Sequence, residues 1–201
     1  MPSATHHLDG VGALHWAWAV CFGHAIMLAC NHVSMQSCSR ATIRPSNHPT
    51  TSSAHLLWPR HQVLSSGHGW ECWRMIPSEV IRFQELIRTT GAGGVVILSG
   101  DRHEGGVYRL PPSIVPYPVY EVTSSSLTHS FRTSGPADEE ADPFRMGSAV
   151  HQNNFGAVRI DWGLRQLSVS LYSSDDCGLA RQVECYLLGS ICQAGRGVPT
   201  E

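Results

Sequence analysis

The sequence predicts an α/β fold organised around a layered sheet, and three observations lead to this expectation. A helical pattern over residues 77–90 ends at Gly91, and a short Gly-rich loop joins it to the apolar run 94–99. From residue 155 onward, the pattern changes to the period-two alternation of β-strands. A helix that leads directly into a buried strand is an αβ unit of a layered sheet. The chain of 201 residues is long enough for one ordinary domain with its own core.

The composition is that of an ordinary globular protein. Hydrophobic residues make up 42% of the chain and charged residues 15%, which argues against intrinsic disorder. The formal net charge is −2. We therefore expect neither a nucleic-acid partner nor a polybasic membrane-binding surface.

The helical segment has clear start and stop signals. Pro77 suits the first turn, where a missing N–H costs no hydrogen bond, and Gly91 supplies the stop. Between them, apolar residues recur at helical spacing, at Val80, Phe83, Leu86 and Ile87. The following run, GVVILS at 94–99, is rich in β-branched residues and has the length of a strand, so we expect it to be buried on both faces of a sheet.

Further strands are predicted in the second half of the chain. YPVYEVTSS at 117–125 alternates enough to form one strand. FGAVRIDW at 155–162 and QLSVSLYS at 166–173 alternate on either side of a turn, which is a hairpin signal. ARQVECYLL at 180–188 suits another strand, and the polar, turn-rich stretch 132–149 reads as a surface loop.

The first 61 residues differ in amino-acid composition from the rest of the chain. They contain a single acidic residue, Asp9, and many His, Ser, Thr and Ala residues. The run 11–30 is apolar and just long enough to span a membrane, but His15 and His24 interrupt it and a membrane would make both costly. We expect no membrane association, and one apolar helix at most over 11–30 in a poorly ordered segment.

Five potential zinc ligands also lie in this region, and they are Cys21, His24, Cys30, His32 and Cys38. Their spacings match no zinc finger or ribbon. A small His/Cys metal-binding module unrelated to phosphate chemistry is kept as a further interpretation.

An acid and a histidine lie two residues apart just where the strand 94–99 ends, in the stretch SGDRH. Reactive groups of layered α/β proteins collect where strands end and loops begin. A carboxylate oxygen and an imidazole nitrogen are both ligands for Zn, Fe or Mn. Asp101 and His103 are therefore candidate metal ligands, and on an extended stretch they would point to the same side. The alternative is that Asp101 caps a turn and His103 is a surface residue.

Four stretches in order along residues 62–172 resemble the carboxy-terminal part of the PhoD-like (alkaline-phosphatase-D-like) family of calcineurin-like metallophosphoesterases. They are QVLSSGHGWECWRMIPSEVIRFQELI, VVILSGDRH, YPVYEVTSSSLTHSF and NNFGAVRIDW. The resemblance implies an incomplete α/β/β/α sandwich with a mixed sheet. It divides the chain into a non-family segment (1–61), a metallophosphatase part (62–192) and a tail (193–201).

The resemblance also implies an activity and a set of residues. Members of the family hydrolyse phosphate mono- or diesters at a dinuclear metal site. Asp101 and His103 then correspond to metal ligands, for divalent or trivalent Ca, Fe, Mn or Zn. Arg102 and His129 are expected near the phosphate as catalytic residues. Glu71 and Trp73 match the family's E-x-W, where packing is the expected role.

Residues 1–61 lack the remaining ligand motifs of the family, and two ligands cannot hold two cations. Two interpretations follow. One is a metallophosphatase-family chain, with hydrolysis of model substrates expected at or near background. The other is a catalytically inactive fragment that binds or scaffolds, with a protein partner covering an exposed sheet.

Overall fold

The computed structural model describes residues 54–131 and 141–188, and strand backbone at 4–8, 14–21, 24–29, 40–45 and 191–194. Side chains are described over 55–131 and 141–185.

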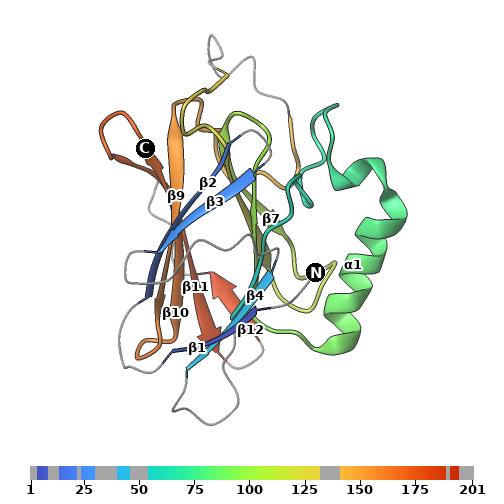
Figure 1. Ribbon diagram of the computed structural model, residues 1–201. Helices are drawn as coiled ribbons and strands as arrows, with labels where there is room; N and C mark the ends of the chain where they lie inside the picture. Colours follow the sequence, from blue (N-terminus) through green and yellow to red (C-terminus); the bar gives the residue numbers. More distant parts are fainter. Residues whose placement is uncertain are drawn as a thin grey trace.

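These residues form two sheets and one α-helix, stacked as three layers. Figure 1 shows helix α1 (Pro77–Thr90) along one side, a mixed sheet in the middle and an antiparallel sheet on the other side. We refer to the mixed sheet as sheet A and to the antiparallel one as sheet B. The predicted α/β class with a mixed sheet is confirmed. In the described part of the chain, the implied sandwich therefore lacks a second helical layer.

Sheet A combines parallel and antiparallel pairs. β5 and β8 both pair in parallel with β6, whereas β7 pairs with β8 and β4 pairs with β5 in the antiparallel sense. β5 and β6 are joined through α1, which is the crossover that a parallel pair requires. In spatial order the strands are β1 (Ala4–Leu8), β4 (Arg40–Pro45), β5 (Ala54–Leu57), β6 (Val95–Ser99), β8 (Val119–Ser124) and β7 (Gly105–Leu110).

Sheet B is antiparallel throughout the pairs that the structure describes. In spatial order its strands are β12 (Ile191–Ala194), β11 (Leu179–Leu188), β10 (Gln166–Ser173), β9 (Asn154–Asp161), β2 (Leu14–Cys21) and β3 (His24–Ala29). The alternation in β9 buries Val158 and Ile160 and turns Arg159 outward. One continuous core joins these inner side chains to those of sheet A, because each sheet buries one face against the other.

Helix α1 begins and ends where the sequence predicts. Pro77 occupies its first turn, and Gly91 ends it in the left-handed conformation, with φ of 61°. A short 3₁₀ turn, η1 (Trp73–Met75), precedes the helix. Of the predicted apolar stripe, Ile87 is buried, but Leu86 is 57% exposed.

The predicted strands of the family-like region are also present. The run 94–99 corresponds to β6, which is buried along its whole length as expected. The hairpin is formed by β9 and β10, with Gln166 opposite Asp161. The stretch 117–125 contains β8, and 180–188 lies in β11. β7 is an additional strand that the sequence reasoning did not predict, because its Gly-rich start hides the alternation.

The expected helix over 11–30 is wrong, because β2 and β3 lie there instead. They pair with each other, with Cys21 opposite His24, and β2 continues sheet B beside β9. An apolar run does not by itself distinguish a helix from a buried strand. In the stretch WAWAV, large and small residues alternate with the period of two that suits a strand.

Hydrogen bonds cross the predicted boundary at residue 61. β5 pairs with β6, and β2 pairs with β9. The division of the chain into three parts stays a prediction, and residues 195–201 lie outside the described part. The side chains of the five potential zinc ligands before residue 40 also lie outside it. Among the described helices, none is long and apolar enough to cross a membrane.

Candidate metal centre

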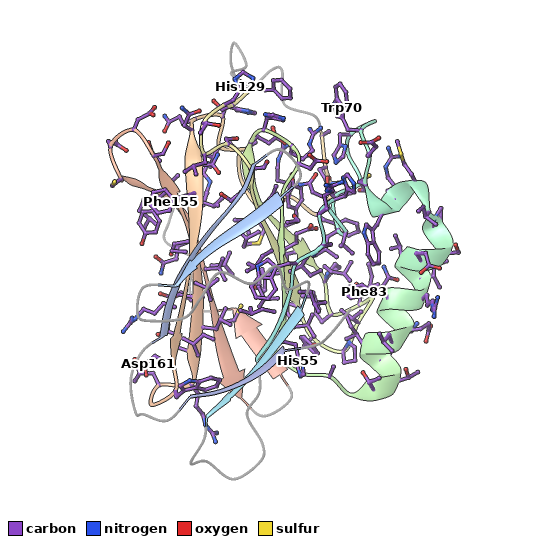
Figure 2. All side chains as sticks on the ribbon, in the orientation of Figure 1. His55, Trp70, Phe83, His129, Phe155 and Asp161 are labelled. Atoms are coloured by element: carbon purple, nitrogen blue, oxygen red, sulfur yellow. The ribbon has the colours of Figure 1, made fainter. Side chains whose placement is uncertain are left out.

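The candidate site lies at the edge of sheet A where its parallel strands end. β5 runs from Ala54 to Leu57 and leads to His61, while β6 ends at Ser99 and leads to Asp101. Because parallel strands point the same way, their carboxyl ends meet at one edge. Figure 2 shows His55, at the start of β5, near the lower end of sheet A, whereas His129 and Trp70 lie toward the upper end.

Three potential metal ligands converge here, and we call them the cation-ligand group: His61, Glu71 and Asp101. Their ligand atoms all lie within 4.8 Å of one another. Nδ1 of His61 is 3.0 Å from Oδ2 of Asp101, yet this buried nitrogen makes no hydrogen bond within the described part of the chain. About a third of each of these two side chains is exposed, although the Nδ1 atom itself is buried.

The donor set suits a first-row transition metal. One imidazole nitrogen and two carboxylate oxygens are ligands of Zn²⁺, Mn²⁺ or Fe, at about 2.0–2.2 Å. In a tetrahedral zinc site, ligand atoms are roughly 3.3 Å apart, which is close to the observed separation of His61 and Asp101. Ca²⁺ prefers six to eight oxygen ligands, so it fits this group less well. The group offers ligands for a single cation.

The backbone turns sharply after β6, at Asp101 and His103. Both residues adopt left-handed conformations, with φ of 67° and 53°. Non-glycine residues rarely do so, and each such residue costs on the order of 1–3 kcal/mol. The expectation that the two side chains share one side assumed an extended chain, which this turn is not. Asp101 belongs to the cation-ligand group and His103 does not. That the two side chains face one cleft stays a prediction.

His103 packs in a second cluster with His129 and Phe131. The ring centroids of His103 and His129 are 5.4 Å apart, and those of His103 and Phe131 are 4.8 Å apart. A backbone hydrogen bond from Phe131 to the carbonyl of His103 holds the two segments together. The structure therefore places two of the sequence-predicted residues, His103 and His129, next to each other.

Arg102 is turned inward toward other protein groups. Its guanidinium lies 3.3 Å from the Glu104 carboxylate, and both side chains are about nine-tenths buried. Its backbone N–H donates a 3.0 Å hydrogen bond to Ser125 Oγ. His151 Nδ1 lies 3.6 Å from the other oxygen of Glu104. Arg102 is thus engaged with Glu104, and its predicted role at a phosphate stays a prediction.

The segment that carries His61 is held on sheet A by a buried carboxylate. Glu121, in β8, is fully buried, and its oxygens accept hydrogen bonds from the backbone N–H groups of Val63 and Leu64 at 2.6–3.2 Å. Burial raises the pKa of Glu121 to about 7, despite hydrogen bonds from Ser99, Leu64 and Val63 that favour its charged form.

A second carboxylate holds the far end of the same segment. Oδ2 of Asp142 accepts hydrogen bonds from Ser65 Oγ and from the backbone N–H groups of Ser66 and Gly67, all at 2.7–2.8 Å. Partial burial alone would raise the pKa of Asp142. The bonds from Phe144, Ser66, Gly67 and Ser65 outweigh that effect and hold it below its ordinary value. We call residues 62–67 the clamped segment, because two carboxylates fix its backbone.

Sequence reasoning missed His61 and did not give Glu71 a ligand role. His61 stands alone between Arg60 and Gln62, without a recognisable spacing to another ligand. Glu71 was expected to pack beside Trp73, which does pack edge-on against Phe83 at 6.0 Å. Glu71 itself is exposed, in the cation-ligand group. The signal available for it was the E-x-W stretch, which fixes its position but not its role.

Comparisons with known proteins give one similar structure. No protein-family model matches the chain, and no curated protein matches it. A solved structure described as "Structure of PhoD" aligns with a TM-score of 0.48 and 12% sequence identity, over 72% of this chain and 32% of that one. The chain thus spans about a third of the length of that protein. Membership of the PhoD-like family, which the sequence motifs predict, stays a proposal.

Proposed function

We propose that this chain is a metallophosphatase-type protein that binds one transition-metal cation through His61, Glu71 and Asp101. The observation that carries the proposal is the convergence of three ligand atoms within 4.8 Å at the carboxyl ends of β5 and β6. The resemblance of the stretches around Glu71 and Asp101 to the PhoD-like family gives the reaction class, hydrolysis of phosphate mono- or diesters.

A cation bound by His61, Glu71 and Asp101 would supply the positive charge needed to polarise a phosphoryl oxygen. The chain's own residues hold it and leave the site open, since His61 and Asp101 are each about one-third exposed. A dinuclear site requires further ligands and a bridging carboxylate, for which we offer no candidates among the described residues. Turnover by this chain alone is therefore at or near background.

The test is a calorimetric titration of the full chain with Mn²⁺ and with Zn²⁺. The wild type binds about one cation, and Asp101→Asn binds at least tenfold more weakly, because a ligand charge is lost. Asp161→Asn serves as the matched control. Asp161 lies at the opposite end of the molecule (Figure 2), where it accepts a turn hydrogen bond from Leu164 that an asparagine also accepts. Equal affinity of the wild type and Asp101→Asn would refute the site.

One observation favours the second candidate, an inactive chain that binds another protein. Large apolar side chains are exposed on α1 and just before it, at Trp70, Met75, Ile76, Ile81 and Leu86. Exposed apolar side chains of this number mark interaction surfaces in many proteins. This candidate predicts self-association or partner binding that is unchanged in Asp101→Asn. The calorimetric titration and a sedimentation measurement, each on the wild type and on Asp101→Asn, distinguish the cation-binding protein from the inactive protein-binding chain.

A further inference from the structure

We propose that Glu121 is a positioning residue for the cation-ligand group. Its carboxylate fixes the backbone of the clamped segment and thereby holds His61 beside Asp101. The inference rests on the proposed cation site and adds a residue from a different strand to it.

Glu121 lies in β8, between β6 and the edge strand β7 of sheet A, and has no access to solvent. It accepts hydrogen bonds from two successive backbone N–H groups, of Val63 and Leu64, which follow His61 by two and three residues. When Glu121 is ionised, its carboxylate makes charge-assisted contacts with these N–H groups, which are about twice as strong as neutral ones. The backbone immediately after His61 is therefore fixed by one side chain from β8.

A chain of side-chain hydrogen bonds strengthens the same attachment. Gln62 Nε2 donates to Thr123 Oγ1 at 2.8 Å, and Thr123 Oγ1 lies 2.9 Å from Ser99 Oγ. Thr123 is in β8 and Ser99 ends β6, two residues before Asp101. The network thus connects the residue next to His61 with the strand that leads to Asp101, through atoms that are all buried.

The network also reaches the third ligand. The backbone N–H of Trp73 donates to the carbonyl of Gln62 at 2.9 Å, and His68 Nε2 lies 2.8 Å from Gln62 Oε1. Trp73 follows Glu71 by two residues, so this bond joins the residue after His61 to the segment that carries Glu71. The loop that carries His61 and Glu71 contains no strand or α-helix that could hold it in place, and the side chains of sheet A do so instead.

Groups that orient metal ligands have a measurable effect on affinity. Substitution of such outer partners typically weakens metal binding 10–100-fold. A merely structural role of Glu121 would lower the stability of the whole protein without a matching loss of affinity. A positioning role and a merely structural role of Glu121 therefore predict different metal affinities for a Glu121 variant, relative to a variant of an equally buried control residue.

The experiment compares the wild type, Glu121→Gln and Val169→Ala as full chains. Gln keeps one acceptor oxygen but turns an NH₂ group toward backbone donors. Val169 is buried in β10 of sheet B, so its truncation leaves a cavity away from the site. We measure Mn²⁺ affinity by calorimetry and, without metal, amide hydrogen exchange. Glu121→Gln is expected to weaken binding by about tenfold or more, while Val169→Ala changes it by less than about twofold.

Amide exchange in the absence of metal gives the independent readout. The amides of Val63 and Leu64 are expected to exchange faster in Glu121→Gln, while those of β10 exchange as in the wild type. Equal loss of affinity in both variants, or unchanged exchange at these two amides, would overturn the proposal. If Glu121→Gln fails to fold, Thr123→Val tests the same network by removing the acceptor of Gln62, with the same two readouts.

A different result would refute the proposed cation site rather than the positioning role of Glu121. A wild-type chain that binds neither Mn²⁺ nor Zn²⁺ refutes the cation site itself. The exchange data then decide the positioning role alone: faster exchange confined to the clamped segment supports it, and exchange that is unchanged or raised throughout the chain refutes it.

Discussion

His61 Nδ1 lies 3.0 Å from Asp101 Oδ2, although the two residues come from loops on either side of helix α1. The nitrogen makes no hydrogen bond in the described part of the chain. Two ligand atoms at this separation, with a third carboxylate within 4.8 Å, form an arrangement that a cation would stabilise. If this contact binds a cation, substitution of His61 weakens metal binding more than substitution of His103, the histidine that the sequence suggested.

The first prediction compares these two histidines. His61→Ala should weaken Zn²⁺ binding at least tenfold, because it removes the nitrogen ligand of the group. His103→Ala should change the affinity by less than about threefold, since its ring packs against His129 and Phe131 instead. Calorimetric titration of both variants provides the measurement. A larger loss in His103→Ala than in His61→Ala would restore the pair expected from the SGDRH stretch.

The second prediction concerns catalysis. The full chain should hydrolyse p-nitrophenyl phosphate and its bis ester at or near background with Mn²⁺, Zn²⁺, Ca²⁺ or Fe added. Three ligands hold one cation, whereas hydrolysis of this class uses two cations that clamp the attacking and leaving oxygens. A heat-treated sample gives the background rate. Robust metal-dependent turnover that His61→Ala or Asp101→Asn abolishes would show that further ligands exist in the chain.

The third prediction follows from the pKa of Glu121, which burial raises from an ordinary value near 4.5 to about 7. Between these pH values the folded state holds a proton that the unfolded chain has released, so stability falls as the pH rises. The loss is on the order of a few kcal/mol, because one pKa unit corresponds to about 1.4 kcal/mol. Glu121→Gln cannot ionise, so it should lack this part of the pH dependence. Urea unfolding of both proteins from pH 4 to pH 8 measures the difference.

The groups around Glu121 do not remove this effect. Asp142, through its negative charge, contributes to raising the pKa of Glu121. Tyr108 stays neutral over this range, because burial and then the charge of Glu104 raise its pKa further above its ordinary value. Parallel pH profiles of the wild type and Glu121→Gln would contradict the prediction.

Much of the fold could be predicted from local patterns. Helix α1 and strands β6, β9 and β10 follow from periodicity together with Pro77 and Gly91, because these signals are set by neighbouring residues. The strands before residue 30 could not be separated from a helix by apolar content alone. The two residues between Cys21 and His24 are Phe22 and Gly23, and the glycine there was the available hairpin signal.

The candidate site was predicted only in part, for a different reason. Asp101 was found because it follows a recognisable strand. His61 joins it through tertiary structure: Glu121 and Asp142 fix the segment after it, and neither carboxylate is close in sequence. The left-handed backbone at Asp101 and His103 also has no glycine to announce it. Local patterns do not contain this information, so no sequence pattern indicated His61.

The fourth prediction concerns Asp142, whose pKa is held below its ordinary value of 3.8. Although partial burial opposes this shift, hydrogen bonds from Phe144, Ser66, Gly67 and Ser65 outweigh it. A carboxylate with a lowered pKa adds stability that is present above the ordinary value and is lost as the pH falls through the folded value. Asp142→Asn should therefore be less stable than the wild type at pH 7, and the difference should shrink below about pH 4. Urea unfolding at pH 7, 4 and 3 measures it, and a constant difference would contradict this account.

The last prediction uses two glycines of the same loop. A Cβ added to Gly67 would lie 2.3 Å from the carbonyl oxygen of Ala141, which is backbone and cannot rotate away. Gly67→Ala should therefore displace the clamped segment from Asp142, lower stability by about 1–3 kcal/mol, and weaken Mn²⁺ binding. Gly69→Ala is the matched control, because a Cβ there meets nothing within 4 Å. Thermal unfolding and calorimetric titration of both variants measure the two effects. If Gly67→Ala loses stability but binds Mn²⁺ as tightly as Gly69→Ala, the position of the clamped segment does not control the cation-ligand group.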